Sequence, residues 1–183
     1  MTKLVPQSHA ALHTMCEEVP VEEITSAKVQ KVIKDMRQAL IDYSAKGFVG
    51  VAIAAPQIGV PLRIFLVEDA EAIKRKEEPV LPFMVAVNPR IVKVSGKRED
   101  VGEGCLSVPD HYGIVSRAKN CTIRAYDEYG KAFERGAGGL LAQIFQHEHD
   151  HLDGMLFVDV AEEVMHKSEL EKRRPKHTVE TDE

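Results

Sequence analysis

The sequence predicts a mixed fold in which helical segments flank a middle region of strands. Apolar residues recur at helical spacing over residues 26–43 and again over residues 140–152. Between them, short runs rich in valine, isoleucine and phenylalanine end at glycine, proline or asparagine, which is typical of strands. With 183 residues and 44% hydrophobic content, the chain can bury one sizeable core, so we expect one domain over residues 1–183.

The composition argues against several classes of protein. A formal net charge of -5 gives no general attraction to nucleic acid, and no specific DNA binding is expected. The N-terminus lacks the apolar run of a secretion signal, and no stretch approaches the roughly 20 apolar residues of a membrane span. The three cysteines are odd in number and widely spaced, which argues for a reducing compartment. We therefore expect a cytoplasmic protein.

The first third of the chain is expected to hold an arm, a helix and a loop of small residues. Residues 1–20 show no clear periodicity of apolar residues and are interpreted as an extended arm lying over the core. The helix that follows has Thr25 or Ser26 as its N-cap and Gly47 beyond its end. In residues 47–60, small side chains surround a glutamine and would let the backbone approach a ligand, although the pattern alone favours tight internal packing.

Most of the chain from residue 62 to residue 136 is expected to form sheet. The predicted elements are strands over residues 62–68, 83–89 and 90–94 and a hairpin over residues 121–136 with its turn ending at Gly130. A break is expected at Asn88–Pro89, because proline cannot continue a central ladder. The charged segment 69–79 is interpreted as a solvated excursion.

The C-terminal part is expected to contain two helices with a last strand between them. The helix over residues 140–152 ends before Gly154, a residue type favoured just after a helix. Residues 155–160 are predicted to be the last strand. Residues 161–174 are predicted to be a helix, because acidic residues come early and basic residues late. Residues 175–183 are polar and expected to be frayed.

The segment QHEHDHLDG carries the strongest chemical signal in the chain. On a helix, His147 and His151 project from nearly the same face one turn apart, which suits a single metal ion. Glu148 lies about 100° round the helix from His147 and could reach a metal-bound water as a general base. His149 points away from that face and is interpreted as a surface or supporting residue.

The two histidines still need a third ligand. Cys105 lies in VGEGCLSVP, a segment with little bulk before the thiol. A free buried cysteine is more often a core residue. Cysteine is nevertheless a standard third ligand in zinc-like sites that keep a position open for water.

Three blocks of the sequence together resemble the peptide deformylase family, whose members remove the N-formyl group from the initiator methionine of new proteins. Residues Gly50 to Gln57 are similar to the family pattern GxGxAAxQ, with Ala52 in place of the second glycine. EGCLS and QHExDH are both intact, at residues 103–107 and 146–151. The resemblance covers about Gly47 to Asp159.

The resemblance implies an α+β fold, with antiparallel or mixed sheets wrapped round the HExxH helix, and one catalytic domain. It implies that Cys105, His147 and His151 bind one divalent metal ion and that Glu148 is the acid and base. The oxyanion would face the Gln57 amide and the Leu106 backbone N–H. The residues implied in substrate binding are Gly50, Val51, Ala52, Gly104, Leu140 and Ile144. Of these, Val51, Leu140 and Ile144 would line the methionine pocket, and Ala52 would either narrow the cleft or pack into the core.

The resemblance also implies the metal and the partners. The metal would be Fe²⁺, with Zn²⁺, Ni²⁺ or Co²⁺ as substitutes, and the substrates would be N-formylmethionyl peptides. The C-terminal helix, with its basic run Lys172–Lys176, would contact the ribosome or form a solvated tail. Two alternatives remain open, another HExxH amide hydrolase or peptidase, and an inactive or altered-specificity deformylase-like factor at the ribosome. The second alternative draws support from Ala52 and the basic run, but the metal ligands, Glu148 and Gln57 are all present, so it ranks below the deformylase function.

Overall fold

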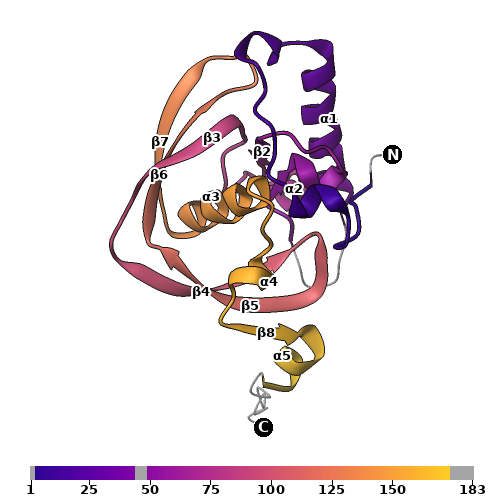
Figure 1. The fold of residues 1–183 in the computed structure, drawn as a ribbon. Coiled ribbons are helices and arrows are strands. Elements are labelled where there is room, and N and C mark those ends of the chain that lie inside the picture. The colour runs from indigo at the N-terminus through magenta and orange to yellow at the C-terminus, as the bar shows by residue number, and fades with distance from the viewer. Residues whose placement is uncertain (1–2, 44–48, 174–183) are drawn as a thin grey trace.

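The computed structural model describes residues 3–43 and 49–173 and has an α+β fold (Figure 1). A five-stranded antiparallel sheet has the order β1-β2-β3-β6-β7, and a three-stranded antiparallel sheet has the order β4-β5-β8. Helix α3 (Gly139–Leu152) lies between these sheets, as the resemblance implied. The larger sheet consists of β1 (Ala52–Ala54), β2 (Ile64–Val67), β3 (Met84–Val94), β6 (Asn120–Tyr126) and β7 (Ala132–Gly138). The smaller sheet consists of β4 (Arg98–Cys105), β5 (Val108–Ala118) and β8 (Glu163–His166).

The two long helices begin and end where their sequences indicate. In α1 (Ala27–Asp42), the hydroxyl of Ser26 accepts a hydrogen bond from the N–H of Val29 at 3.3 Å, which makes Ser26 the N-cap. Gly47 lies outside the described residues. Helix α3 is followed by Gly154 at φ 76°, where a Cβ would come within 2.9 Å of the Thr14 backbone nitrogen. Only glycine fits this close approach without strain.

Several shorter elements complete the fold. In the described part of the chain, 3₁₀ helices span Ala10–His13 (η1), Val21–Glu23 (η2) and Ala55–Ile58 (η3), and short α-helices span Ala70–Arg75 (α2), Phe157–Val160 (α4) and Lys167–Arg173 (α5). Helix α2 lies in the segment expected to be a solvated excursion. Its charged side chains are largely exposed, but Ala70 and Ala72 are buried against the core. Strands β1, β4 and β5 had no counterpart in the sequence prediction.

The two strands predicted for residues 83–94 are a single strand, β3. Pairing with β6 shifts register between Val87 and Arg90, so Asn88 and Pro89 form an irregularity inside the strand instead of ending it. Asn88 adopts φ 52°, and its side chain bonds the backbone N–H and C=O of Val19 at 2.8 and 2.7 Å. These contacts hold the backbone where the ladder is interrupted.

Two predictions near the C-terminus were wrong. Residues 155–160 do not form a strand, because Asp159 Oδ2 accepts the N–H of Leu156 at 2.8 Å and residues Phe157–Val160 turn into α4. Residues 161–174 do not form one helix. Strand β8 pairs with β5 over Glu163–His166, and α5 starts only at Lys167. The predicted tail at residues 175–183 lies outside the described part.

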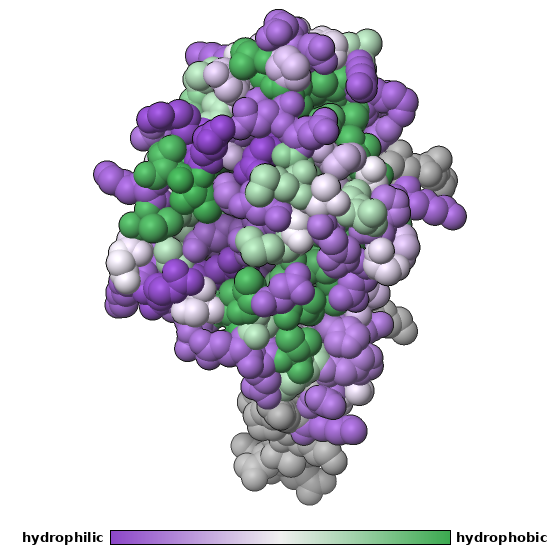
Figure 2. All heavy atoms as spheres, in the orientation of Figure 1, coloured by the Kyte–Doolittle hydropathy of each residue, from purple (hydrophilic) through white to green (hydrophobic). Residues whose placement is uncertain are grey.

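The N-terminal arm packs across the end of α3. The N–H of Cys16 donates to the Leu152 carbonyl at 2.8 Å, and the N–H of Val5 donates to the Gln57 carbonyl at 2.9 Å. Apolar side chains are mainly enclosed between the helices and sheets, and on the face in Figure 2 hydrophilic surface separates the hydrophobic patches. Among the described residues, no helix combines the length and apolar character needed to cross a membrane.

Candidate metal and active site

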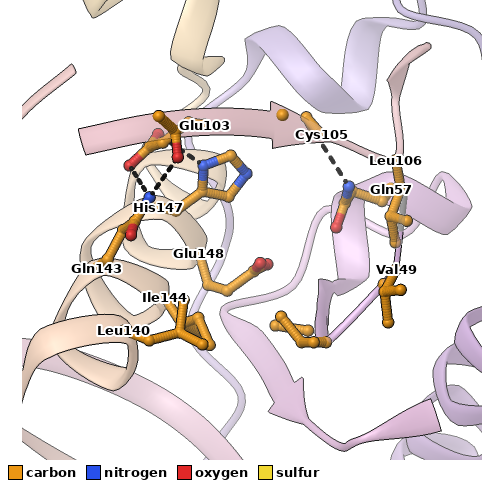
Figure 3. A pocket seen from close by; sticks show the side chains of 15 residues that line it. Val49, Gln57, Glu103, Cys105, Leu106, Leu140, Gln143, Ile144, His147 and Glu148 are labelled. Carbon is orange, nitrogen blue, oxygen red and sulfur yellow. Dashed lines mark hydrogen bonds and ion pairs between the residues drawn. The ribbon is translucent and has the colours of Figure 1, made fainter. Parts of the chain in front are cut away.

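A pocket of about 300 Å³ opens between α3, strand β4 and the segment that leads into β1 (Figure 3). Its lining is Val49, Gly50, Val51, Ala52, Gln57, Gly102, Glu103, Gly104, Cys105, Leu106, Leu140, Gln143, Ile144, His147 and Glu148. Every residue that the sequence assigned to catalysis or substrate binding lines this pocket. Of the three candidate ligands, Cys105 and His147 line it, while His151 is fully buried.

The candidate ligands meet at the inner end of the pocket. One ligand atom each from Cys105, His147 and His151 lies within 4.8 Å of the others. Cys105 Sγ is 3.2 Å from His151 Nε2, and the ring centroids of His147 and His151 are 4.9 Å apart. Cys105 reaches this place from the end of β4, where a register shift between Gly104 and Cys105 interrupts the pairing with β5. A sulfur and two imidazoles this close together can hold a transition-metal ion.

A buried carboxylate fixes the orientation of His147. Glu103 Oε2 lies 3.0 Å from His147 Nδ1, so Nδ1 donates to the carboxylate and Nε2 is the ring nitrogen left for the cluster. Arg117 donates to both oxygens of Glu103 at 2.8 and 2.9 Å, and to Asp150 at 2.6 Å. The sequence prediction gave Glu103 and Arg117 no role. A glutamate two residues before a candidate ligand was the available signal for Glu103, whereas no local pattern marks Arg117.

The same contacts determine the charges around the cluster. Burial raises the pKa of Glu103, but hydrogen bonds from His147 and Arg117 outweigh it and lower the pKa to about 2. Burial lowers the pKa of His147, but hydrogen bonds to Cys105 and Glu103 raise it well above the ordinary value. Burial and the nearby charge of His147 hold the pKa of His151 well below its ordinary value. Glu103 is therefore a carboxylate anion at neutral pH.

Glu148 places a second buried carboxyl group beside the cluster. Its side chain is 4% exposed, and its Oε2 has no hydrogen-bond partner among the described residues. Burial raises the pKa of Glu148 to about 7, the charge of His147 lowers it, and the charges of Glu103 and Asp150 raise it. A cation bound to the cluster would lower the pKa of Glu148. A carboxyl group poised near neutral pH can both take and give a proton.

Gln57 lies across the pocket from His147 and Glu148 (Figure 3). Its Oε1 accepts the N–H of Ala54 at 2.8 Å, which turns Nε2 towards Ser107 Oγ at 3.2 Å and Cys105 Sγ at 3.4 Å. The amide donor thus points at the cluster side of the pocket. Leu106 follows Cys105 in the turn between β4 and β5 and lines the pocket too.

The remaining histidine and cysteines named in the sequence analysis lie outside this pocket, and Ala52 belongs to both the pocket and the core. His149 points away from the cluster, as expected, and contacts Arg63 and Asp153 at 3.3 Å each. Cys16 and Cys121 are core residues, and burial raises the pKa of each thiol to about 11. Ala52 both lines the pocket and packs in the core between α3 and the larger sheet. Val49, Gly102 and Gln143 line the pocket but were not predicted to do so.

Known proteins are similar to this chain in both sequence and fold. The profile of the family described as polypeptide deformylase matches residues 1–167. The chain is 40% identical over 148 residues to a peptide deformylase of Carboxydothermus hydrogenoformans, covering 81% of this chain and 86% of that protein. It is 37% identical over 168 residues to the chloroplastic peptide deformylase 1A of Solanum lycopersicum, covering 87% of this chain.

The coverage of the relatives is uneven. The chain spans 59% of the length of the Solanum protein. A Met-Ala-Ser-bound peptide deformylase from Acinetobacter baumannii has a similar structure, with a TM-score of 0.74 and 29% identity over 86% of this chain and 96% of that one. The family match over most of the chain, together with relatives more than 30% identical, shows that this chain belongs to the polypeptide deformylase family.

Proposed function

We propose that this chain is a metal-dependent hydrolase that removes the N-formyl group from the first methionine of newly synthesised polypeptides, and that residues 1–183 hold one catalytic domain. The observation that carries the proposal is the meeting of a Cys-His-His cluster and the buried carboxyl of Glu148 in one pocket. Membership of the deformylase family supports the same activity.

The residues fit a divalent metal ion. The donor set of one thiolate and two imidazoles is one that metals such as zinc accept while leaving a position open for water. The unpartnered Oε2 of Glu148 is a buried polar atom that needs a partner, and a water at that open position would supply one. A divalent ion held by Cys105, His147 and His151 would lower the pKa of its water from the bulk value towards about 7 and so supply hydroxide near neutral pH.

The chain's own residues supply the proton transfers and the charge stabilisation. Glu148 takes a proton from the attacking water and passes it to the leaving amine, which restores the carboxylate. As the formyl carbon is attacked, its oxygen becomes anionic. Gln57 Nε2, which already points at the cluster, donates to that oxygen together with the Leu106 backbone N–H. Each well-placed donor of this kind is worth about 3 to 4 kcal/mol in the transition state.

The pocket suits an extended peptide. Strand β1 is an edge strand of the larger sheet, β4 is an edge strand of the smaller one, and both line the pocket. An extended substrate could therefore pair with the free edges of β1 and β4, beside Gly50, Ala52 and Gly104. Val51, Leu140 and Ile144 present apolar side chains to the first residue of the peptide. The Met-Ala-Ser peptide bound to the Acinetobacter protein is what would remain after formyl-Met-Ala-Ser loses its formyl group.

We propose Fe²⁺ as the metal in the cell, with Zn²⁺, Ni²⁺ and Co²⁺ as substitutes. The sulfur and imidazole donors of the cluster are compatible with all four ions. A ferrous ion bound to a thiolate is prone to oxidation, so the iron form should lose activity in air faster than the nickel form. We also propose a cytoplasmic location and a ribosome contact through the C-terminal region. Of the basic run Lys172–Lys176, the structure describes only the first two residues.

Product analysis tests this function against the alternatives. The metal-loaded chain is incubated without oxygen with formyl-Met-Ala-Ser, acetyl-Met-Ala-Ser and Met-Ala-Ser. Formate and intact Met-Ala-Ser should appear from the first peptide only. Cleavage between residues of the peptides would instead indicate a peptidase. Absence of any cleavage by the metal-loaded chain would support the inactive factor and contradict the proposal.

A further inference from the structure

Gln143 is a polar side chain in an otherwise apolar stretch of the pocket wall. On α3 it lies between Leu140 and Ile144 on the side of the pocket, one turn before His147. Figure 3 shows its side chain reaching from the helix towards Glu103 on β4. It takes no part in the hydrolysis proposed above, so its amide needs another explanation.

Its hydrogen bonds determine which way the amide faces. The side-chain nitrogen donates to the Gly102 carbonyl at 2.9 Å and approaches Glu103 Oε1 at 3.5 Å. Both partners are acceptors, so the nitrogen of Gln143 must face β4 and the amide cannot be turned round. Its Oε1 accepts no hydrogen bond from any described residue. The pocket wall thus contains a fixed acceptor without a protein donor.

We propose that Gln143 Oε1 accepts a hydrogen bond from the first side chain of the substrate, so that the pocket takes, besides methionine, first residues whose side chain ends in a donor. This inference rests on the proposed function of the same pocket. The thioether of methionine offers no donor, whereas glutamine has a similar length and ends in an NH₂ group. A side chain that ends in a donor gains this hydrogen bond, whereas a side chain without one leaves the acceptor to water.

The test compares two substrates in the same protein. The kcat/KM is measured for formyl-Gln-Ala-Ser and formyl-Met-Ala-Ser with the nickel-loaded parent and with Gln143→Met and Gln143→Leu. The glutamine-to-methionine ratio should fall about fivefold or more in both variants. Any general loss of folding or metal binding affects both substrates equally and cancels in the ratio. Gln38→Met, an exposed change on α1, should leave the ratio at the parent's value.

A ratio that stays within about twofold of the parent's in both Gln143 variants, or that rises in either, would overturn the inference. Failure of the proposed function gives a different result. If the parent cleaves no formyl peptide, the same ratio is read from calorimetric binding of Gln-Ala-Ser and Met-Ala-Ser. The inference then still requires that the relative affinity for the glutamine peptide fall in both Gln143 variants and remain unchanged in Gln38→Met.

Discussion

At the scale of single residues, Glu148 carries the largest share of the proposed chemistry. It is buried beside the cluster, and no other carboxyl group in the pocket is free of a strong partner, since Glu103 is held by Arg117 and His147. We predict that Glu148→Gln keeps its metal and that kcat falls at least about 100-fold. Glu134→Gln, an exposed change on β7, serves as the control. Near-normal kcat at full metal content would contradict the role of Glu148.

Gly50 illustrates a residue whose lack of a side chain matters. A Cβ at this position would lie 2.8 Å from Leu40 Cδ1 and 3.1 Å from Leu106 Cδ2. Gly50→Ala should therefore displace Leu106 and reduce kcat/KM for formyl-Met-Ala-Ser by about tenfold or more, because small shifts of catalytic groups are costly. A Cβ at Gly96 would meet no atom within 4 Å, so Gly96→Ala is the matched control. Equal kcat/KM for the two variants would refute this prediction.

At the scale of elements, Arg117 connects three of them. It lies on β5, bonds Glu103 on β4 and reaches Asp150 on α3. Removing one partner of a buried ion pair leaves the other charge uncompensated, so Arg117→Met should lower the free energy of unfolding by about 3 kcal/mol or more. Lys119→Met breaks the exposed pair with Glu99 and should cost about 1 kcal/mol or less. Denaturant unfolding at equal metal saturation measures both losses, and similar values would contradict the importance of the buried network.

Local sequence signals predicted the elements whose boundaries depend on local chemistry. Ser26 caps α1 with its own hydroxyl, and α3 ends just before Gly154 because the arm leaves no room for a side chain there. The candidate ligands were predictable for the same reason. His147, Glu148 and His151 are near neighbours on one helix, and Cys105 lies in an intact family motif.

Two of the wrong predictions, at β8 and at Pro89, reflect contacts between distant parts of the chain. Strand β8 exists because residues Glu163–His166 pair with β5, although their local charge pattern favours a helix. Pro89 stays inside β3 because Asn88 bonds Val19, 69 positions earlier in the sequence. Gln143 and Arg117 acquire their roles only when β4 lies against α3. No local pattern in the sequence contains this information.

At the scale of the whole molecule, the C-terminal region is separable from the site. A deletion after Ala161 would remove β8 and expose an edge of β5, so the truncated variant should end at His166. We predict that a chain ending at His166 hydrolyses formyl-Met-Ala-Ser within about twofold of the full chain, because the pocket lies elsewhere. Its co-sedimentation with ribosomes should weaken, and the salt-dependent part of that binding should disappear. Co-sedimentation equal to that of the full chain at every salt concentration would refute the ribosome contact.

The central claim is that one metal ion, held by Cys105, His147 and His151, makes this pocket a deformylase. The most direct test is an anaerobic titration of the metal-free chain with Fe²⁺, with formate release from formyl-Met-Ala-Ser as the readout. The rate should rise linearly to one equivalent of iron and then remain constant. Cys105→Ala and His151→Ala should stay near the metal-free rate throughout. Formate release by the metal-free chain, or a full response to iron in either variant, would contradict the claim.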